Sequence, residues 1–301
     1  MESGKPIVNE PIAAMQSLCR LAVLMTCHNR VESTLRCLSA IEKQQLPWGV
    51  SVAAYLVDDG CTDGTAEAVR RLHPWVTVLA GSGGLFWCGG MRVAFAEAVR
   101  QDFDFYLWLN DDTTLHEHAI GRLVSVHQTP PTIVVGTTTD PDTGRPSYGG
   151  VIRRCAWHPF RFTMVRPAEI AQPCHTMNGN CVLVPRAVTN VVGNMDPAFY
   201  HGFGDYDYGL RARRAGFAVT VAPGTIGTCI RNRRRLPWRD PSLSRRQRWA
   251  SVVGPKGLPP REMLVYARRH GGLLWPLFWC MPYVRALLLP TRLRLALGEP
   301  L

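Results

Sequence analysis

The segment LWLNDDT, residues 107–113, ends an apolar run with an amide, Asn110, and two adjacent carboxylates, Asp111 and Asp112. The run has the length and composition of a buried strand. Two neighbouring carboxylates repel each other unless a cation lies between them. A hard divalent ion with oxygen ligands would stabilise the pair, and a solvated turn or a helix N-cap is the alternative. The segment therefore predicts a strand that ends at a candidate metal site.

Strands and helices alternate on the N-terminal side of this segment. Four apolar runs have the length of buried strands: 21–26, 50–57, 76–79 and 103–109. Helical patterns lie between them at 31–44, 65–72 and 91–100, and a Gly-rich loop is expected at 81–90. This alternation predicts an α/β fold in which helices cover both faces of a mostly parallel sheet.

The rest of the chain continues this pattern less regularly. Short strands are expected at 132–136, 148–153, 160–165, 180–185 and 217–221, and a helix at 205–215. Polar clusters follow three of the N-terminal strands, at 26–30, 58–63 and 110–112. Ligands of open α/β sheets bind beyond the carboxyl ends of the strands, so these clusters indicate an active site at one edge of the sheet.

Four segments in this order give the chain a resemblance to a known family. They are Thr26 to Arg30, Val57 to Thr65, Asn110 to Asp112 and Gly204 to Gly216. Together they resemble the motifs of nucleotide-sugar glycosyltransferases of family 2, which have the GT-A fold. The third motif has the form Asn-x-Asp and is similar to that of rhamnosyltransferase-like members. It favours a dTDP-sugar or UDP-sugar as donor and rhamnose as the sugar.

The resemblance implies a set of residues that bind the nucleotide-sugar donor. They are Thr26, Asn29, Arg30, Asp58, Asp59, Gly83, Gly84, Arg92, Asn110 and Asp111. Asp58 would accept a hydrogen bond from the imide N–H of a uracil or thymine base. A turn of the Asx type is the alternative for Asp58 and Asp59, and the two aspartates allow both roles.

The resemblance also implies an inverting reaction that depends on Mg²⁺ or Mn²⁺. Asp112 would coordinate the ion with help from Asn110, and the ion would neutralise the leaving nucleotide diphosphate. Asp205 would take the proton of the acceptor hydroxyl as general base, and Asp207 is a second candidate. Gly204 stands where the family usually has a Glu.

Three further residues are expected to bind the acceptor, a glycan or lipid-linked glycan: Asn178, Asn180 and His201. The alternative for the asparagines is turn formation around Gly179, and for His201 it is packing.

The charge is divided unequally along the 301 residues, whose formal net charge is +11. Residues 1–210 hold 16 basic and 20 acidic side chains, whereas residues 211–301 hold 18 basic and 3 acidic ones. Such a basic segment predicts an anionic partner, which could be a phosphate group, a nucleic acid or a membrane surface.

We expect three parts: an N-terminal tail at 1–18, the GT-A domain at 19–225, and a basic helical extension at 226–301. In the extension, residues 273–289 are apolar except for Arg285. The stretch is too short to span a bilayer and is flanked by Arg and Trp, which favours a segment at a membrane interface. A helix packed on the body is the alternative.

The cysteines and the N-terminus bear on location. None of the ten cysteines forms a C-x-x-C pair, and residues 1–16 do not resemble a secretory signal. These features predict reduced thiols and a cytoplasmic protein, held peripherally on the inner face of the membrane. A zinc site would need Cys155, His158, Cys174 and His175, whose spacing matches no common site, so buried thiols are favoured.

Two rival functions follow from the same sequence. A nucleic-acid-binding protein would use the eight arginines of residues 231–248, but only Trp238 and Trp249 lie among them to stack on bases. We therefore expect no nucleic acid as partner. An inactive scaffold of the same fold is the second rival, because of Gly204 and because Cys229 lies where the family often has a metal-binding His.

Overall fold

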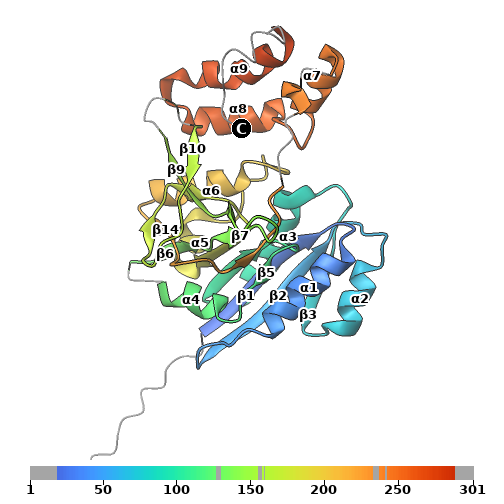
Figure 1. Cartoon of the computed structure of the whole chain (residues 1–301), viewed down its shortest axis with the longest axis vertical. Helices are drawn as coiled ribbons and strands as arrows, with labels where there is room; N and C mark the ends of the chain where they lie inside the picture. The colour runs from blue at the N-terminus through green and yellow to red at the C-terminus, as the bar shows by residue number, and fades with distance from the viewer. Residues whose placement is uncertain are drawn as a thin grey trace, which may run out of the picture.

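The computed structural model has an α/β body that carries a group of helices at its C-terminal end (Figure 1). The structure describes residues 19–126, 130–154, 158, 160–232, 237–240 and 243–288. The predicted N-terminal tail lies outside the described residues, and so do Cys155 and Arg233 to Arg235.

A mixed sheet of eight strands forms the centre of the body, in the order β11-β14-β6-β13-β4-β1-β2-β3. The strands are β1 (Cys19–Cys27), β2 (Val50–Asp58), β3 (Val76–Ala80), β4 (Phe105–Leu109), β6 (Thr132–Val135), β11 (Gln172–Pro173), β13 (Cys181–Pro185) and β14 (Ala218–Val221). Only β13 and β11 run antiparallel to their neighbours. The prediction of a mostly parallel sheet is confirmed.

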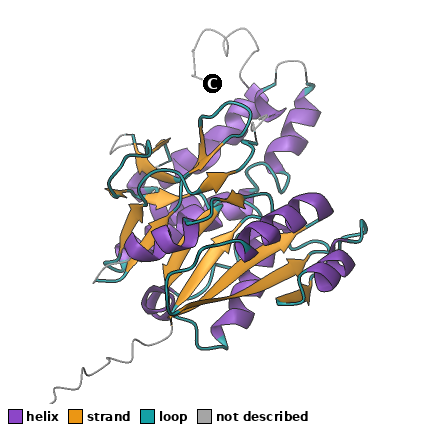
Figure 2. Cartoon of the chain, turned by 60° about the horizontal axis from the view of Figure 1, so that its bottom comes forward, coloured by secondary structure: helices purple, strands orange, loops and turns teal. Residues whose placement is uncertain are grey.

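Helices cover both faces of this sheet (Figure 2). One face packs against α1 (Val31–Glu42), α2 (Thr65–Leu72) and α4 (Ala119–Val126). The other packs against α3 (Phe86–Val99), α5 (Arg186–Val192) and α6 (Gly204–Arg214). Because β1 lies between these layers, Leu21 and Val23 face α1 while Ala22 and Leu24 face α3. Burial on both faces explains why its sequence is continuously apolar.

Two small sheets complete the body. One joins β9 (Gly150–Arg153) to β10 (Phe162–Met164) and β12 (Thr176–Met177). The other has the order β5 (Thr114–Leu115), β15 (Gly227–Thr228), β7 (Thr138–Thr139) and β8 (Pro146–Tyr148). Since β15 pairs with β5 and β7, the body continues past residue 225, where we expected the extension to begin.

The loop expected at residues 81–90 ends earlier, because α3 begins at Phe86. The carboxylate of Asp59 accepts hydrogen bonds from the backbone N–H groups of Gly83, Leu85 and Phe86 at 2.7–3.0 Å. A distant side chain thus caps the first turn of α3, so no local capping residue marks the start of this helix.

The extension contains η1 (Pro237–Arg239), α7 (Arg245–Val253), α8 (Pro260–His270), η2 (Gly272–Leu274) and α9 (Trp275–Leu288). Packing among α7, η1 and α9 buries a small core of Trp238, Val252, Tyr283 and Ala286. α8 contacts the body through Arg269, which pairs with Asp207 of α6. No helix within the described residues is both long and apolar enough to cross a membrane.

Candidate active site

The carboxyl ends of β1, β2 and β4 bring the three predicted polar clusters to one edge of the sheet. Cys27 of β1 lies beside Asp58 of β2 in the parallel register. On the other side, Leu24 of β1 pairs with Trp108 of β4, which leads into Asn110 to Asp112. The sequence predicted this meeting from strand order alone, because parallel strands end at the same edge.

Arg30 connects the first and third clusters. Its Nη1 donates to Oδ1 of Asp111 at 3.2 Å and to Oδ2 of Asp112 at 3.0 Å. The Asp111 side chain is buried, and burial, opposed by Arg30, raises its pKa to about 6. Arg30 thus neutralises a carboxylate pair that would otherwise repel, which is the role that the sequence gave to a metal ion.

The residues around Asp112 fit a hard divalent ion. Oδ2 of Asp111 is buried and has no hydrogen-bond partner among the described residues, and the half-buried Asp112 carboxylate is partly open to solvent. Oδ1 of Asn110 accepts a hydrogen bond from Trp87 Nε1 at 2.8 Å, so this amide is oriented by a neighbouring indole. Cys229 donates its thiol to Oδ1 of Asp112 at 3.3 Å. Carboxylate oxygens and water are ligands that Mg²⁺ and Mn²⁺ prefer.

Asp58 and Asp59 divide the two roles that the sequence left open. Asp59 is buried, and both of its oxygens accept from the backbone of residues 83–86, so its position favours a structural role over donor binding. Asp58 accepts one bond from the N–H of Cys61 at 2.8 Å and closes an Asx-type turn. The Asp58 side chain is half-buried, so its carboxylate keeps some access to a nucleotide base.

Two other residues expected to bind the donor, Thr26 and Asn29, hold the loops at this edge of the sheet together. Thr26 donates to the carbonyl of Val57, and a Cβ on Gly90 would lie 2.1 Å from its hydroxyl oxygen. Asn29, at a φ of 51°, accepts from the N–H of Thr62 and joins the loop after β1 to the loop after β2.

Two glycines and one arginine complete the expected donor set. Gly83, at a φ of 84°, has its Cα 2.8 Å from where a Cβ on Gly60 would lie, and both Gly83 and Gly84 are exposed. Nη1 of Arg92 donates to the carbonyl of Phe199 at 3.4 Å, so this side chain points toward residues 194–199. Gly83 and Gly84 are therefore the members of this group that are open to a ligand.

Asp205 lies at the first turn of α6 and is half-buried. Its Oδ2 accepts a hydrogen bond from the N–H of Gly179 at 3.0 Å, which holds the carboxylate against the turn between β12 and β13. The same turn contacts the metal motif, because the N–H of Asn110 donates to the carbonyl of Asn180 at 3.0 Å. One turn therefore connects the candidate base with the candidate metal ligands.

Close packing explains why Gly204 stands where the family usually has a Glu. A Cβ at this position would lie 2.6 Å from Sγ of Cys88, which is buried at the start of α3. Real Cβ atoms do not approach sulfur this closely, so α3 and α6 can meet only where a glycine stands. Gly204 thus reflects close packing of two helices and does not count against the assignment of Asp205.

Asp207 occupies a different environment from Asp205. It is fully buried, and its oxygens accept from Arg211 at 2.8 Å, from Arg269 at 2.7 Å and from His270 at 2.8 Å. Although burial raises its pKa, these three partners outweigh it and hold the pKa below its usual value. A carboxylate that is enclosed and fully paired is a poor proton acceptor for a substrate, which disfavours Asp207 as the base.

The three expected acceptor residues lie near Asp205. Asn178 donates to the phenol oxygen of Tyr206 at 3.4 Å, and the buried Asn180 donates to Sγ of Cys229 at 3.6 Å. The ring of His201 packs edge-on against Phe86, which agrees with the packing alternative. Asn178 is half-buried and therefore has greater access to solvent than Asn180.

Sequence reasoning missed two residues that shape the site. Trp87 orients Asn110 and packs so tightly on Gly179 that a Cβ there would lie 2.2 Å from the indole. Glu262 of α8 is buried and accepts a hydrogen bond from the N–H of Tyr200 at 3.3 Å, in the loop before Asp205. The signal for Glu262 was present, because it is one of only three acidic residues after position 210.

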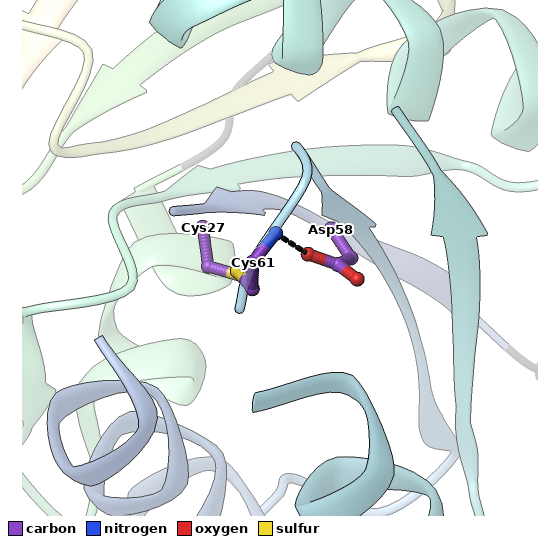
Figure 3. A group of neighbouring side chains, drawn as sticks. All are labelled: Cys27, Asp58 and Cys61. Carbon is purple, nitrogen blue, oxygen red and sulfur yellow. Dashed lines mark hydrogen bonds between the residues drawn. The ribbon is translucent and has the colours of Figure 1, made fainter. Parts of the chain in front are cut away.

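Among the described residues, the zinc candidates His158, Cys174 and His175 do not form a metal-binding group. Nδ1 of His175 accepts from the backbone N–H of Arg153, and Cys174 is buried against Gly150. The structure groups a different set, Cys27, Asp58 and Cys61, close enough together to hold an ion (Figure 3).

The fold and the carboxylates at the ends of β2 and β4 are those of a glycosyltransferase with the GT-A architecture. A family model described as glycosyltransferase like family 2 matches residues 19–254, so the chain belongs to this family and is a glycosyltransferase. A comparison with curated proteins found no match.

Among solved structures, one similar fold is "Mannosyltransferase PcManGT from Pyrobaculum calidifontis in complex with GDP-Man and Mn2+". The two chains superpose with a TM-score of 0.54 at 16% sequence identity, over 95% of this chain and 77% of that one. At this identity the likeness supports the fold.

Proposed function

We propose that this glycosyltransferase moves a sugar from a nucleotide donor to a glycan or lipid-linked glycan, with inversion at the anomeric carbon. The observation that carries this proposal is the turn at residues 178–180, which joins the two halves of the site. Gly179 holds Asp205, and Asn180 holds Asn110, each through a backbone hydrogen bond of 3.0 Å. A base and a diphosphate-binding motif must face one sugar from opposite sides for an inverting displacement.

The donor lies along the carboxyl ends of β1, β2 and β4 in this proposal. The Asp58 carboxylate accepts the imide N–H of a uracil or thymine base, and Asp112 would hold Mg²⁺ or Mn²⁺. The ion supplies charge neutralisation to the leaving diphosphate when it is bound. The fold relative bound to GDP-Man and Mn²⁺ supports a divalent ion and a hexose, and rhamnose keeps its support only from Asn110.

Asp205 acts as the general base. Its Oδ2 is held by Gly179, and its Oδ1 accepts from the N–H of Tyr206 at 2.8 Å, so the carboxylate is fixed before the acceptor arrives. An acceptor hydroxyl oriented by Asn178 passes its proton to this carboxylate as its oxygen attacks the anomeric carbon. Arg30 pairs with Asp111 and Asp112, and Asp112 is the more accessible of the two carboxylates and would hold the ion.

The acceptor is presented at a membrane surface in this proposal. Exposed apolar side chains form one stripe along η2 and α9: Leu273, Leu274, Leu277, Met281, Val284 and Leu288. The basic extension, residues 226–301, holds 15 basic and 3 acidic side chains, and this charge of +12 complements an anionic bilayer. A lipid-linked acceptor would meet the enzyme there, on the cytoplasmic side.

A donor screen tests the proposal. Purified protein with Mn²⁺ is incubated with UDP-, dTDP- and GDP-sugars, and release of nucleoside diphosphate is measured, with the Asp205→Asn variant as control. We expect release from a uracil or thymine nucleotide sugar. Release from none of them, or equal release by the variant, would contradict the proposal and favour an inactive scaffold. Stabilisation by duplex DNA but not by nucleotide would favour the nucleic-acid-binding alternative.

A further inference from the structure

Two cysteines, Cys27 and Cys61, meet the Asp58 carboxylate at the end of β1 and β2, and the proposed transfer reaction gives neither thiol a role. Sγ of Cys27 lies 3.8 Å from Sγ of Cys61. Together with a carboxylate oxygen of Asp58, the two sulfur atoms form a group whose members all lie within 4.8 Å of one another. Figure 3 shows the three side chains converging between the strand ends.

We propose that Cys27, Cys61 and Asp58 form a binding site for a soft divalent cation of the Zn²⁺ class. Two thiolates bound to one zinc at about 2.3 Å, at tetrahedral angles, are about 3.8 Å apart. The two sulfur atoms thus already lie at the spacing of a tetrahedral edge. The carboxylate oxygen completes a three-residue set after a shift of about 1 Å, and water takes the fourth position.

The surrounding backbone orients both Cys61 and Asp58. The N–H of Asn29 donates to Sγ of Cys61 at 3.2 Å, and the positive φ of Asn29 directs this amide toward the sulfur. The N–H of Cys61 donates in turn to Oδ1 of Asp58, which fixes the carboxylate beside the thiol. Hydrogen bonds of this kind orient metal ligands and stabilise their charged forms.

Access and charge also favour a cation. Cys27 is 3% exposed and forms the floor, whereas Cys61 and Asp58 are half-buried and leave a way in from solvent. Four carboxylates follow the strand ends in this region, at Asp58, Asp59, Asp111 and Asp112, and Arg30 pairs with the last two. The negative electrostatic potential of these carboxylates therefore attracts cations to the site.

An ion bound at this site would affect donor binding, and this part of the inference rests on the proposed function. Asp58 is the residue proposed to accept the base of the donor, so the ion and the base compete for one carboxylate. A Zn²⁺-class ion would then lower the affinity for the donor without touching Asp112. Inhibition of this kind differs from replacement of Mn²⁺ at the diphosphate.

Cobalt absorption tests the site without any transferase assay. Co²⁺ is added to reduced, metal-free protein, and the near-ultraviolet charge-transfer band of a Co²⁺–thiolate bond is followed, with Zn²⁺ then added to displace it. We expect one equivalent of Co²⁺ to give the band. Cys61→Ser, which keeps size and polarity, and Cys27→Ala should each weaken binding by about 100-fold or more, since even outer-shell changes cost 10–100-fold.

Controls separate this site from other thiols and from the proposed function. Cys280→Ser alters a half-buried thiol on α9 and should leave the band unchanged. Absence of the band in the folded parent protein, or a band that survives in Cys61→Ser and in Cys27→Ala, overturns the metal site. Addition of UDP should raise the apparent Kd for Co²⁺. A band that UDP does not affect leaves the metal site standing and overturns the competition, and with it the base contact of Asp58.

Discussion

Asp205 and Gly179 are joined by a hydrogen bond of 3.0 Å from the backbone N–H of the glycine to the carboxylate. The two residues are 26 positions apart, and their contact brings the start of α6 onto the turn before β13. Trp87 packs on the other side of the same glycine, where no side chain would fit. The position of the candidate base therefore depends on three separate segments of the chain.

Replacing Asp205 by Asn should remove transfer and leave donor binding intact. The amide keeps an oxygen for the N–H of Gly179 but cannot take the acceptor proton. General-base catalysis contributes typically about 10²–10⁴-fold, so kcat should fall by about that factor while thermal stabilisation by nucleotide stays unchanged. Asp142→Asn, at an exposed turn, is the control and should retain full activity. A loss of only a few-fold for Asp205→Asn would move the base role elsewhere.

Replacing Asp112 by Ala should remove the part of nucleotide binding that requires Mn²⁺. Its carboxylate is the accessible member of the pair held by Arg30. At a nucleotide concentration of about 100 times Kd, the parent gains about 2.7 kcal/mol of stability, which thermal unfolding with and without Mn²⁺ can resolve. The variant should show the same curve in both conditions. Metal dependence that persists in the variant would exclude Asp112 as a ligand.

Replacing Asp207 by Ala should destabilise the protein. Its carboxylate has no exposed surface and is paired with Arg211, Arg269 and His270, which would lose their shared partner. Breaking a buried ion pair in this way costs about 3–5 kcal/mol. Urea unfolding measures the loss, and Asp142→Ala should change the midpoint little. A stable variant with greatly reduced turnover would instead point to a role in catalysis.

The packing between Cys88 and Gly204 should show strong coupling in a double-mutant cycle. Gly204→Ala places a Cβ 2.6 Å from Sγ of Cys88 and should cost about 1–3 kcal/mol, although Ala is otherwise the better helix former. Cys88→Ala removes the sulfur, so the double variant should recover most of that loss. Additive effects in urea unfolding would show that the two side chains do not interfere.

His270 should make stability depend on pH between about 7.5 and 5.5. Burial lowers its pKa below the ordinary value of 6.5, an effect that Asp207 opposes and that Arg214 and Arg269 reinforce. The unfolded state then binds the proton more tightly, so stability falls as pH falls through the usual pKa of histidine. His270→Gln should lose less stability over this range than the parent does. His118→Gln, at an exposed position, should keep the parent slope.

The apolar stripe on α9 should bind anionic vesicles. We expect the protein to sediment with them at low salt and to be partly released at 1 M salt, where the Debye length falls to about 3 Å. Leu277→Ser combined with Met281→Ser should weaken the salt-resistant part. Ile170→Ser, which alters a more exposed apolar side chain of the body, should not weaken it. Protein that stays in the supernatant at low salt, or that dimerises through α9, would contradict the membrane role.

The sequence by itself determined the order of the strands' polar ends and therefore the place of the site. Parallel strands end at one edge, so the motifs at Asp58 and Asn110 to Asp112 had to meet once the apolar runs were recognised as strands. The helix that begins at Gly204 was also predictable, because its pattern is local.

Only the tertiary structure decided which of two neighbouring aspartates is available for chemistry. Asp58 and Asp59 differ because the second is enclosed by the backbone of residues 83–86. Asp205 and Asp207 differ because α8, some 60 residues further along the chain, covers the second with Arg269 and His270. The residues that bury a carboxylate and pair with it come from segments distant in the chain. They determine its charge state and its accessibility to a ligand more strongly than its local motif does.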